Sequence, residues 1–231
     1  MDTNNLQQYL TKVSREMLMN FGKRLDVPIN FPYPEVELRP MLTNAGLSSL
    51  KEGGYKIYIQ SPERNIELEE KVIASSELGL VHEVGHMLHM EANPRLKETY
   101  NRETELVESF LPGRCTPLWH RIFHLGETAA EYLGLQFIDE RQGLNAFFKR
   151  HQKESKTGVY WGVLRSLRKI EGERRMDVAK ILVKSDYEEV RRVPELEEYI
   201  FSATENYIAK HPEIFNPPYQ LSLTGMRHLI R

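Results

Sequence analysis

The sequence predicts a mainly helical α+β fold with a small antiparallel sheet in its first third. Apolar residues recur at helical spacing near the N-terminus and again over most of the chain beyond residue 65. Segments in which apolar and polar residues alternate are confined to residues 35–60. The chain has 231 residues, of which 40% are hydrophobic and 28% charged, so it is large enough to bury a core.

The first 60 residues predict one helix followed by strands. In residues 4–21, apolar residues recur at intervals of three or four and Gly22 follows, which is typical of an amphipathic helix and its end. A proline-rich connection leads to Glu-Val-Glu-Leu, an alternating segment expected to be a strand at 35–38. Residues 44–54 read as a loop, and residues 55–60, Tyr-Lys-Ile-Tyr-Ile-Gln, predict a second strand.

Helices are predicted for the rest of the chain. The helical pattern of residues 65–90 ends before Pro94, because proline cannot continue a helix and disfavours helix in the residue before it. In residues 117–142, Thr116 is suited to the N-cap, Pro117 to the first helical position and Gly143 to the stop. Further helices are expected at about 95–110, 144–154, 159–171, 174–184 and 195–210.

Composition argues against several classes of function. The formal net charge is −2, so no general basic field favours nucleic acid as a partner. No uncharged stretch approaches the ~18 residues that a membrane span needs. Cys115 is the single cysteine, which excludes an intramolecular disulfide, and the N-terminus lacks the apolar segment of a signal peptide. We therefore expect a cytoplasmic protein without nucleic-acid or membrane partners, and leave its oligomeric state open.

Three residues in the 65–90 helix form the pattern His-Glu-x-x-His: His82, Glu83 and His86. Residues four apart on a helix lie about 40° apart around its axis, so both imidazoles can point at one ion. Two imidazoles and one carboxylate suit Zn²⁺ and leave a fourth position for water. Glu83 is placed to take a proton from that water and deliver it to a leaving amine. The pattern predicts one zinc per chain, with Glu83 as the catalytic base.

The surroundings of this pattern favour a buried helix over an exposed polar stripe. Gly85 occupies a helical position where a better helix former would be more stable by ~1 kcal/mol, which indicates that another backbone approaches closely. The histidines are flanked by apolar residues: Leu80, Val81, Val84, Met87 and Leu88.

The third metal ligand has four downstream candidates: Glu105, Glu108, Glu127 and Glu131. The small residues Gly126, Ala129 and Ala130 would let the 117–142 helix pack tightly on the helix that carries the histidines. The segment 103–109 is strongly charged and has no comparable run of small residues.

These motifs resemble those of gluzincin-type zinc metallopeptidases. The run "LGETAAEYLG" resembles their glutamate helix, in which the ligand begins a pattern like E-G-x-A-x-Y. Glu127, Ala130 and Tyr132 match that pattern, and Thr128 replaces the usual glycine. The resemblance covers residues 78–137 and implies a zincin-like core in which a metal-binding helix and a glutamate helix supply His82, His86 and Glu127.

A partial resemblance to thimet-type oligopeptidases keeps other ligands open. Those proteins share H-E-x-G-H-x-x-H, matched here through His89, and "ETELVES" around Glu108 resembles their ligand region. Glu105 has the spacing from His86 that is found in large zinc aminopeptidases. We prefer Glu127 as the third ligand and retain Glu108 and Glu105 as alternatives.

The resemblance implies a zinc metallopeptidase that hydrolyses peptides or unfolded polypeptides. Residues 1–143 would form the zincin-like catalytic region, and residues 144–231 would form helices that pack on it rather than an independent domain. The strand at 55–60 precedes the helix that carries the histidines. In zincin peptidases, the edge strand that binds the substrate also precedes the metal-binding helix. The alternatives are a non-catalytic zincin-like binding or regulatory protein, and a metal-dependent hydrolase of a non-peptide amide.

Other histidines and acids are candidates for supporting roles. His120, His124, Glu127 and Glu131 follow a 4-3-4 spacing and share a helix face. His124 is expected to hydrogen-bond a reaction intermediate or support the ligand, and Glu131 to contact a ligand. A solvated polar edge is the alternative for His120 and Glu131, and a second metal on this face is a weaker one. His89 is interpreted as structural, with substrate orientation as its alternative.

Overall fold

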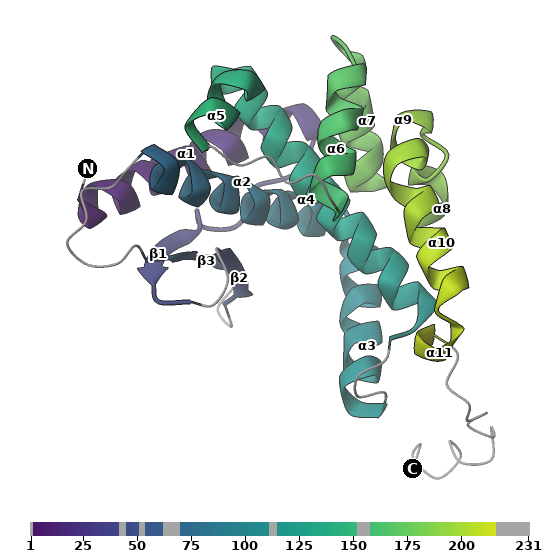
Figure 1. The fold of residues 1–231 in the computed structure, drawn as a ribbon. Helices are drawn as coiled ribbons and strands as arrows, with labels where there is room; N and C mark the ends of the chain where they lie inside the picture. Colours follow the sequence, from purple (N-terminus) through teal and green to yellow (C-terminus); the bar gives the residue numbers. More distant parts are fainter. Residues whose placement is uncertain are drawn as a thin grey trace.

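The computed structural model describes residues 2–41, 45–50, 54–61, 70–110, 115–151 and 158–215. The helices are α1 (Thr3–Leu25), α2 (Glu70–Ala92), α3 (Pro94–Phe110), α4 (Pro117–Gln142), α5 (Leu144–His151), α6 (Gly158–Lys169), α7 (Arg174–Lys184), α8 (Tyr187–Val190), α9 (Pro194–Leu196), the π-helical turn η1 (Glu197–Phe201), α10 (Ser202–Lys210) and α11 (Pro212–Phe215). The strands are β1 (Glu35–Arg39), β2 (Ala45–Ser49) and β3 (Tyr55–Gln60). The fold is mainly helical, as predicted (Figure 1).

The sheet is mixed, so the prediction of an antiparallel sheet was wrong. Its order is β1-β3-β2, in which β1 runs parallel to β3 and β2 runs antiparallel to it. The prediction also treated residues 44–54 as a loop, whereas Ala45–Ser49 form β2. Ala-Gly-Leu-Ser-Ser has no alternation, and its pairing with β3 rather than its own pattern makes it a strand.

The strand at 55–60 was predicted correctly, but its place in the sheet was not. β3 lies between β1 and β2, so it cannot be the edge strand expected from the resemblance. Its side chains alternate in burial, and Tyr55, Ile57 and Ile59 join the core shared with α1 and α2. Among the described strands, β1 and β2 lie at the edges of the sheet, and β2 lines the cavity described below.

The packing of α4 on α2 organises the molecule. A Cβ on Gly85 of α2 would lie 2.6 Å from the Ala130 carbonyl oxygen of α4, so the two backbones touch there. A Cβ on Gly134 would lie 3.1 Å from Val81 Cγ2, which is a second close approach. The close backbone contact predicted from Gly85 is therefore confirmed. In Figure 1, the sheet lies below α2, and α5, α6 and α7 lie above it.

The ends of α4 follow the predicted signals. The Thr116 side chain accepts a hydrogen bond from the Trp119 amide, and Pro117 begins the helix. Gly143 ends it with φ 78°, a conformation that favours glycine. The Thr116 hydroxyl also donates to Glu103 Oε2 at 2.9 Å, which ties α3 to the start of α4.

The C-terminal helices pack on α4 and continue its core. Buried residues of α6 and α7 belong to the same hydrophobic cluster as those of α2 and α4. The Tyr132 hydroxyl donates to the Arg175 carbonyl, and Arg121 pairs with Glu205 of α10 through two hydrogen bonds of 2.7 and 2.8 Å. The helix expected over 195–210 is divided into α9, η1 and α10, and the short helices α8 and α11 were not predicted.

Several predicted segments extend beyond the described part of the chain. The helical pattern before Glu70, residues 152–154 of a predicted helix and everything after Phe215 lie outside the described residues. Within the ranges described, the structure contains no helix with both the length and the apolar character required to cross a membrane.

Candidate metal centre

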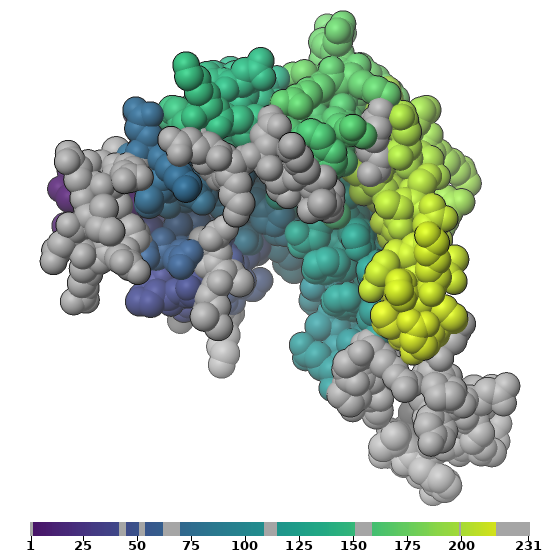
Figure 2. Space-filling view, viewed as in Figure 1, coloured from purple at the N-terminus to yellow at the C-terminus, as the bar shows by residue number. Residues whose placement is uncertain are grey.

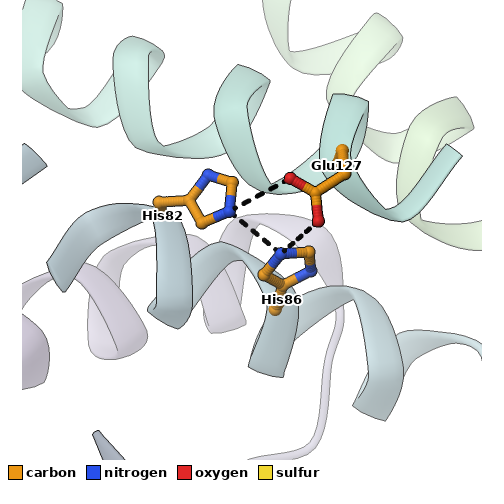
Figure 3. A group of neighbouring side chains, drawn as sticks. All are labelled: His82, His86 and Glu127. Atoms are coloured by element: carbon orange, nitrogen blue, oxygen red, sulfur yellow. Dashed lines mark hydrogen bonds and ion pairs between the residues drawn. The ribbon is translucent and has the colours of Figure 1, made fainter. Parts of the chain in front are cut away.

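Three side chains from two helices converge on one point (Figure 3). His82 Nε2 lies 3.0 Å from His86 Nε2 on α2, and the two nitrogens lie 3.5 and 3.4 Å from the carboxylate oxygens of Glu127 on α4. The donor atoms of all three residues lie within 4.8 Å of one another. Two imidazoles and one carboxylate are the ligand types of catalytic zinc sites, so this donor set fits a zinc ion.

The packing of α2 on α4 explains this convergence. His82 and His86 are four residues apart on α2 and therefore face the same side. Gly85, beside His86, lies against Ala130, which is three residues beyond Glu127 on the same helix. The close approach of the two backbones thus brings the Glu127 carboxylate to the histidine rings.

The charges around the three donors favour a cation. Burial alone would lower the pKa of His82, but the nearby carboxylates of Glu127 and Glu131 outweigh it and raise the pKa to about 10. Burial would raise the pKa of Glu127, but the two histidines hold it well below its usual value. Two imidazoles thus share their surroundings with the carboxylates of Glu127, Glu131 and Glu83, and a divalent cation would balance that negative charge.

Glu131 contacts the far side of the His82 ring. Its Oε1 lies 3.2 Å from His82 Nδ1, although the ring nitrogen makes no well-aligned hydrogen bond in this arrangement. A carboxylate behind a ligand histidine fixes the ring orientation and raises the basicity of the other nitrogen. The placement agrees with the supporting role predicted for Glu131.

Glu83 is adjacent to the donor cluster without belonging to it. It lines the same cavity as His82, His86 and Glu127, yet it is not part of the group whose donor atoms converge. Burial raises its pKa, and the neighbouring histidines act in the opposite direction. This position suits a group that exchanges a proton beside the cluster rather than a ligand.

A cavity of about 410 Å³ opens beside the cluster. Figure 2 shows the molecule hollowed between the sheet and the limb formed by α3 and α4. The cavity is lined by β2 (Gly46, Leu47, Ser49), α2 (His82, Glu83, His86, His89, Met90), Asn93, α3 (Leu96, Lys97, Tyr100) and α4 (Ile122, Phe123, Gly126, Glu127). It offers room for a ligand that reaches the three donors from the side of β2.

The alternative ligands Glu105 and Glu108 lie away from the cluster. Both are exposed on α3, and in the part of the chain that the structure describes neither belongs to a group able to hold a metal. Of the four candidates, the structure brings Glu127 to the histidines and places Glu131 behind one of them.

His120 and His124 form a separate group. Their ring centroids lie 4.4 Å apart, and His120 also packs against Tyr207 and Phe215. Burial lowers the pKa of both imidazoles. Neither lines the cavity described above, so the role expected for His124 stays a prediction. The described residues contain one group able to hold a metal, and His120 and His124 are not in it.

Sequence reasoning missed several cavity residues. Met90 lies four residues after His86 on α2, and this spacing could have pointed to it, whereas Asn93 and Lys97 lie beyond the end of that helix. The contribution of β2 had no such signal, because its segment was not recognised as a strand. Lys97 Nζ lies 3.3 Å from the Tyr55 hydroxyl and 3.6 Å from Glu91 Oε1, so its charge is already paired.

Comparisons with protein-family models, curated proteins and solved structures found no match to this chain. The case for a metal centre therefore depends on the geometry of His82, His86 and Glu127 and on the chemistry of those groups.

Proposed function

We propose that this chain is a zinc-dependent metallopeptidase that hydrolyses peptide bonds in peptides or unfolded polypeptides. The observation that supports this most strongly is the convergence of His82, His86 and Glu127 at the wall of a cavity that also contains Glu83. A structural zinc site is normally closed by four protein ligands, whereas three ligands beside an open cavity leave a position for chemistry.

In the proposed reaction, the metal activates the substrate and the water, and Glu83 transfers the proton. Zinc, when bound, would polarise the substrate carbonyl and acidify a water molecule. The Glu83 carboxylate would accept a proton from the attacking water and pass it to the leaving amine nitrogen. Glu131 would hold the His82 ring in place during this exchange.

The edge strand beside the cavity favours a peptide over a small amide as substrate. Gly46, Leu47 and Ser49 of β2 line the cavity, and β2 has β3 as its strand partner on one side only among the described strands. An extended peptide can add to such an edge through main-chain hydrogen bonds. In this proposal β2 is the edge strand that binds the substrate, the role that the sequence suggested for residues 55–60.

The Glu83→Gln variant tests the proposal. It keeps the size of the side chain and leaves the three donors in place, so we expect it to bind zinc normally and to lose peptide hydrolysis by about 10²–10⁴-fold. Glu108→Gln, on the exposed face of α3, is the matched control and should cleave as the native protein does. Undiminished cleavage by Glu83→Gln would rule out Glu83 as the base.

Profiling the substrates of the zinc-loaded native protein separates the other functions. A zinc-loaded native protein that cleaves no member of a broad peptide library would point to a binding protein. Hydrolysis confined to small non-peptide amides would assign the site to that class of substrate instead.

A further inference from the structure

The outermost helices, α10 and α11, attach to the first half of α4 with little buried apolar surface. Thr204 and Phe215 are the residues of these two helices that are buried. Figure 1 places both helices beside the start of α4, on the side of the molecule away from the sheet. Contacts between ionisable groups and aromatic rings therefore make up much of this attachment.

An ion pair forms one part of the attachment. Arg121 of α4 donates two hydrogen bonds, of 2.8 and 2.7 Å, to the Glu205 carboxylate of α10. The Tyr187 hydroxyl of α8 donates a third, 2.8 Å long, to the same carboxylate. A two-pronged pair of arginine and carboxylate is among the stronger polar contacts in proteins. Its strength depends on Glu205 being ionised.

A cluster of rings forms the other part. The His120 ring of α4 stacks on Tyr207 of α10, with centroids 5.4 Å apart, and lies 5.1 Å from the Phe215 ring of α11. The His124 ring, one turn further along α4, lies 4.4 Å from His120. His120 Nε2 is buried without a hydrogen-bond partner among the described residues. His120 therefore packs here as a neutral ring, and a charge on it would have no described acceptor at Nε2.

Protonation acts on both parts in the same direction. A proton on His120 would place a charge in a buried position, and burial lowers the pKa of this imidazole to about 4. A proton on Glu205 would remove the charge that Arg121 binds, and Arg121 holds the pKa of this carboxyl below its usual value. Each group therefore binds a proton more readily once α10 and α11 have left α4, so acid favours their release.

The other charged and titratable groups near this attachment do not reverse that direction. They come from α3 (Glu103), α4 (Arg121, His124), the α8 region (Tyr187, Glu188, Arg191), α10 (Tyr207), and the start of α11 (His211, Glu213). His124 opposes a positive charge on His120. His211 and Glu213 pair with each other at 3.0 Å and move together with α11, so their charges do not depend on docking.

We infer that His120 and Glu205 form an acid-operated latch, which holds α10 and α11 on α4 at neutral pH and releases them as the pH falls towards 5. The same half of α4 carries the cavity residues Ile122 and Phe123, so release uncovers a helix that also forms the cavity wall. The inference concerns the outer helices and does not depend on the metal centre or on the proposed peptidase function.

Hydrogen exchange of the 231-residue chain, corrected for the intrinsic effect of pH on exchange, tests the latch. Between pH 7 and pH 5, protection of residues 202–215 should fall by about tenfold or more, because a histidine whose pKa docking lowers from 6.5 to about 4 weakens docking by up to about tenfold per pH unit in that interval. Protection of α7, whose buried residues belong to the main core, should change by less than about twofold. This internal reference separates release of α10 and α11 from unfolding of the whole chain.

Three variants assign the effect to the latch. His120→Phe keeps a ring in the stack and removes the titrating nitrogen, so residues 202–215 should be protected about fivefold better than in the native chain at pH 5. Glu205→Gln should lose about tenfold of that protection already at pH 7. His211→Gln is the matched control, because His211 is exposed and paired within α11, and it should keep the native pH dependence. All three positions lie outside the metal centre, so loss of zinc in acid would affect every protein alike.

An NMR titration of the histidine rings in the native chain supplies a second measurement that requires no variant. The His120 ring should titrate at least about one pH unit below the His211 ring. Equal protection of residues 202–215 at pH 7 and pH 5, a His120→Phe protein that loses protection as the native chain does, or equal titration of the two rings overturns the inference.

Discussion

Replacing Gly85 with alanine should force α2 and α4 apart and weaken the metal centre. The new Cβ would lie 2.6 Å from the Ala130 carbonyl oxygen and 2.7 Å from its Cα, and both are backbone atoms that no rotamer change can move. The α4 backbone would have to shift by about 0.8 Å to restore an ordinary contact of 3.4 Å.

The expected effects follow from that shift. Overpacking typically costs about 1–3 kcal/mol, and the better helix propensity of alanine returns about 1 kcal/mol. Because the clash is with backbone, we expect the free energy of unfolding to fall by about 2 kcal/mol. Zinc sites tolerate deviations of about 0.2 Å in ligand distances, so moving Glu127 relative to the histidines should lower zinc affinity by about 10–100-fold.

Two other glycines of the same interface supply a graded control series. A Cβ at Gly134 would meet Val81 at 3.1 Å, and one at Gly126 would meet nothing closer than 3.9 Å. Urea unfolding and competition with a chromophoric zinc chelator should therefore rank the alanine variants as Gly85 most impaired, Gly134 intermediate and Gly126 unimpaired. A Gly85→Ala protein with native stability and native zinc affinity would refute the reasoning.

Three further predictions concern neighbouring groups. Glu131→Gln should lower zinc affinity about tenfold in the chelator assay, and unchanged affinity would remove Glu131 from the centre. Glu77→Ala should lower the free energy of urea unfolding by about 3 kcal/mol, because Glu77 is fully buried and pairs with Arg141; a loss under 1 kcal/mol would contradict this. Arg121 holds the pKa of Glu205 below its usual value, so this carboxylate stabilises the fold above its unfolded-state pKa and ceases to do so as the pH falls through its folded-state pKa. Glu205→Gln should therefore be less stable than the native protein at pH 7, and the difference should shrink towards pH 3.

Features with local causes were predicted best. Thr116, Pro117 and Gly143 mark the ends of α4 because capping depends on neighbouring residues alone. His82 and His86 face one point because helical periodicity fixes their relation. The partner helix was predicted because the small residues beside Glu127 allow close packing, and the backbone contact between Gly85 and Ala130 shows that they do.

Features set by distant pairing were missed. β2 lacks any pattern of its own, and the parallel pairing of β1 with β3 joins two strands that are not consecutive in the chain. The cavity wall combines β2, α3 and α4, and no local signal shows that these three elements meet. The π-helical turn at Glu197–Phe201 interrupts a periodic segment that reads as one helix in the sequence.

The zinc content of the purified 231-residue chain, measured after dialysis against metal-free buffer, tests the central claim most directly. We predict one zinc per chain in the native protein and in Glu108→Ala, and little or none in Glu127→Ala. A native protein that retains no zinc when supplied with it, or a Glu127→Ala protein that binds zinc as tightly as the native one, would contradict the account.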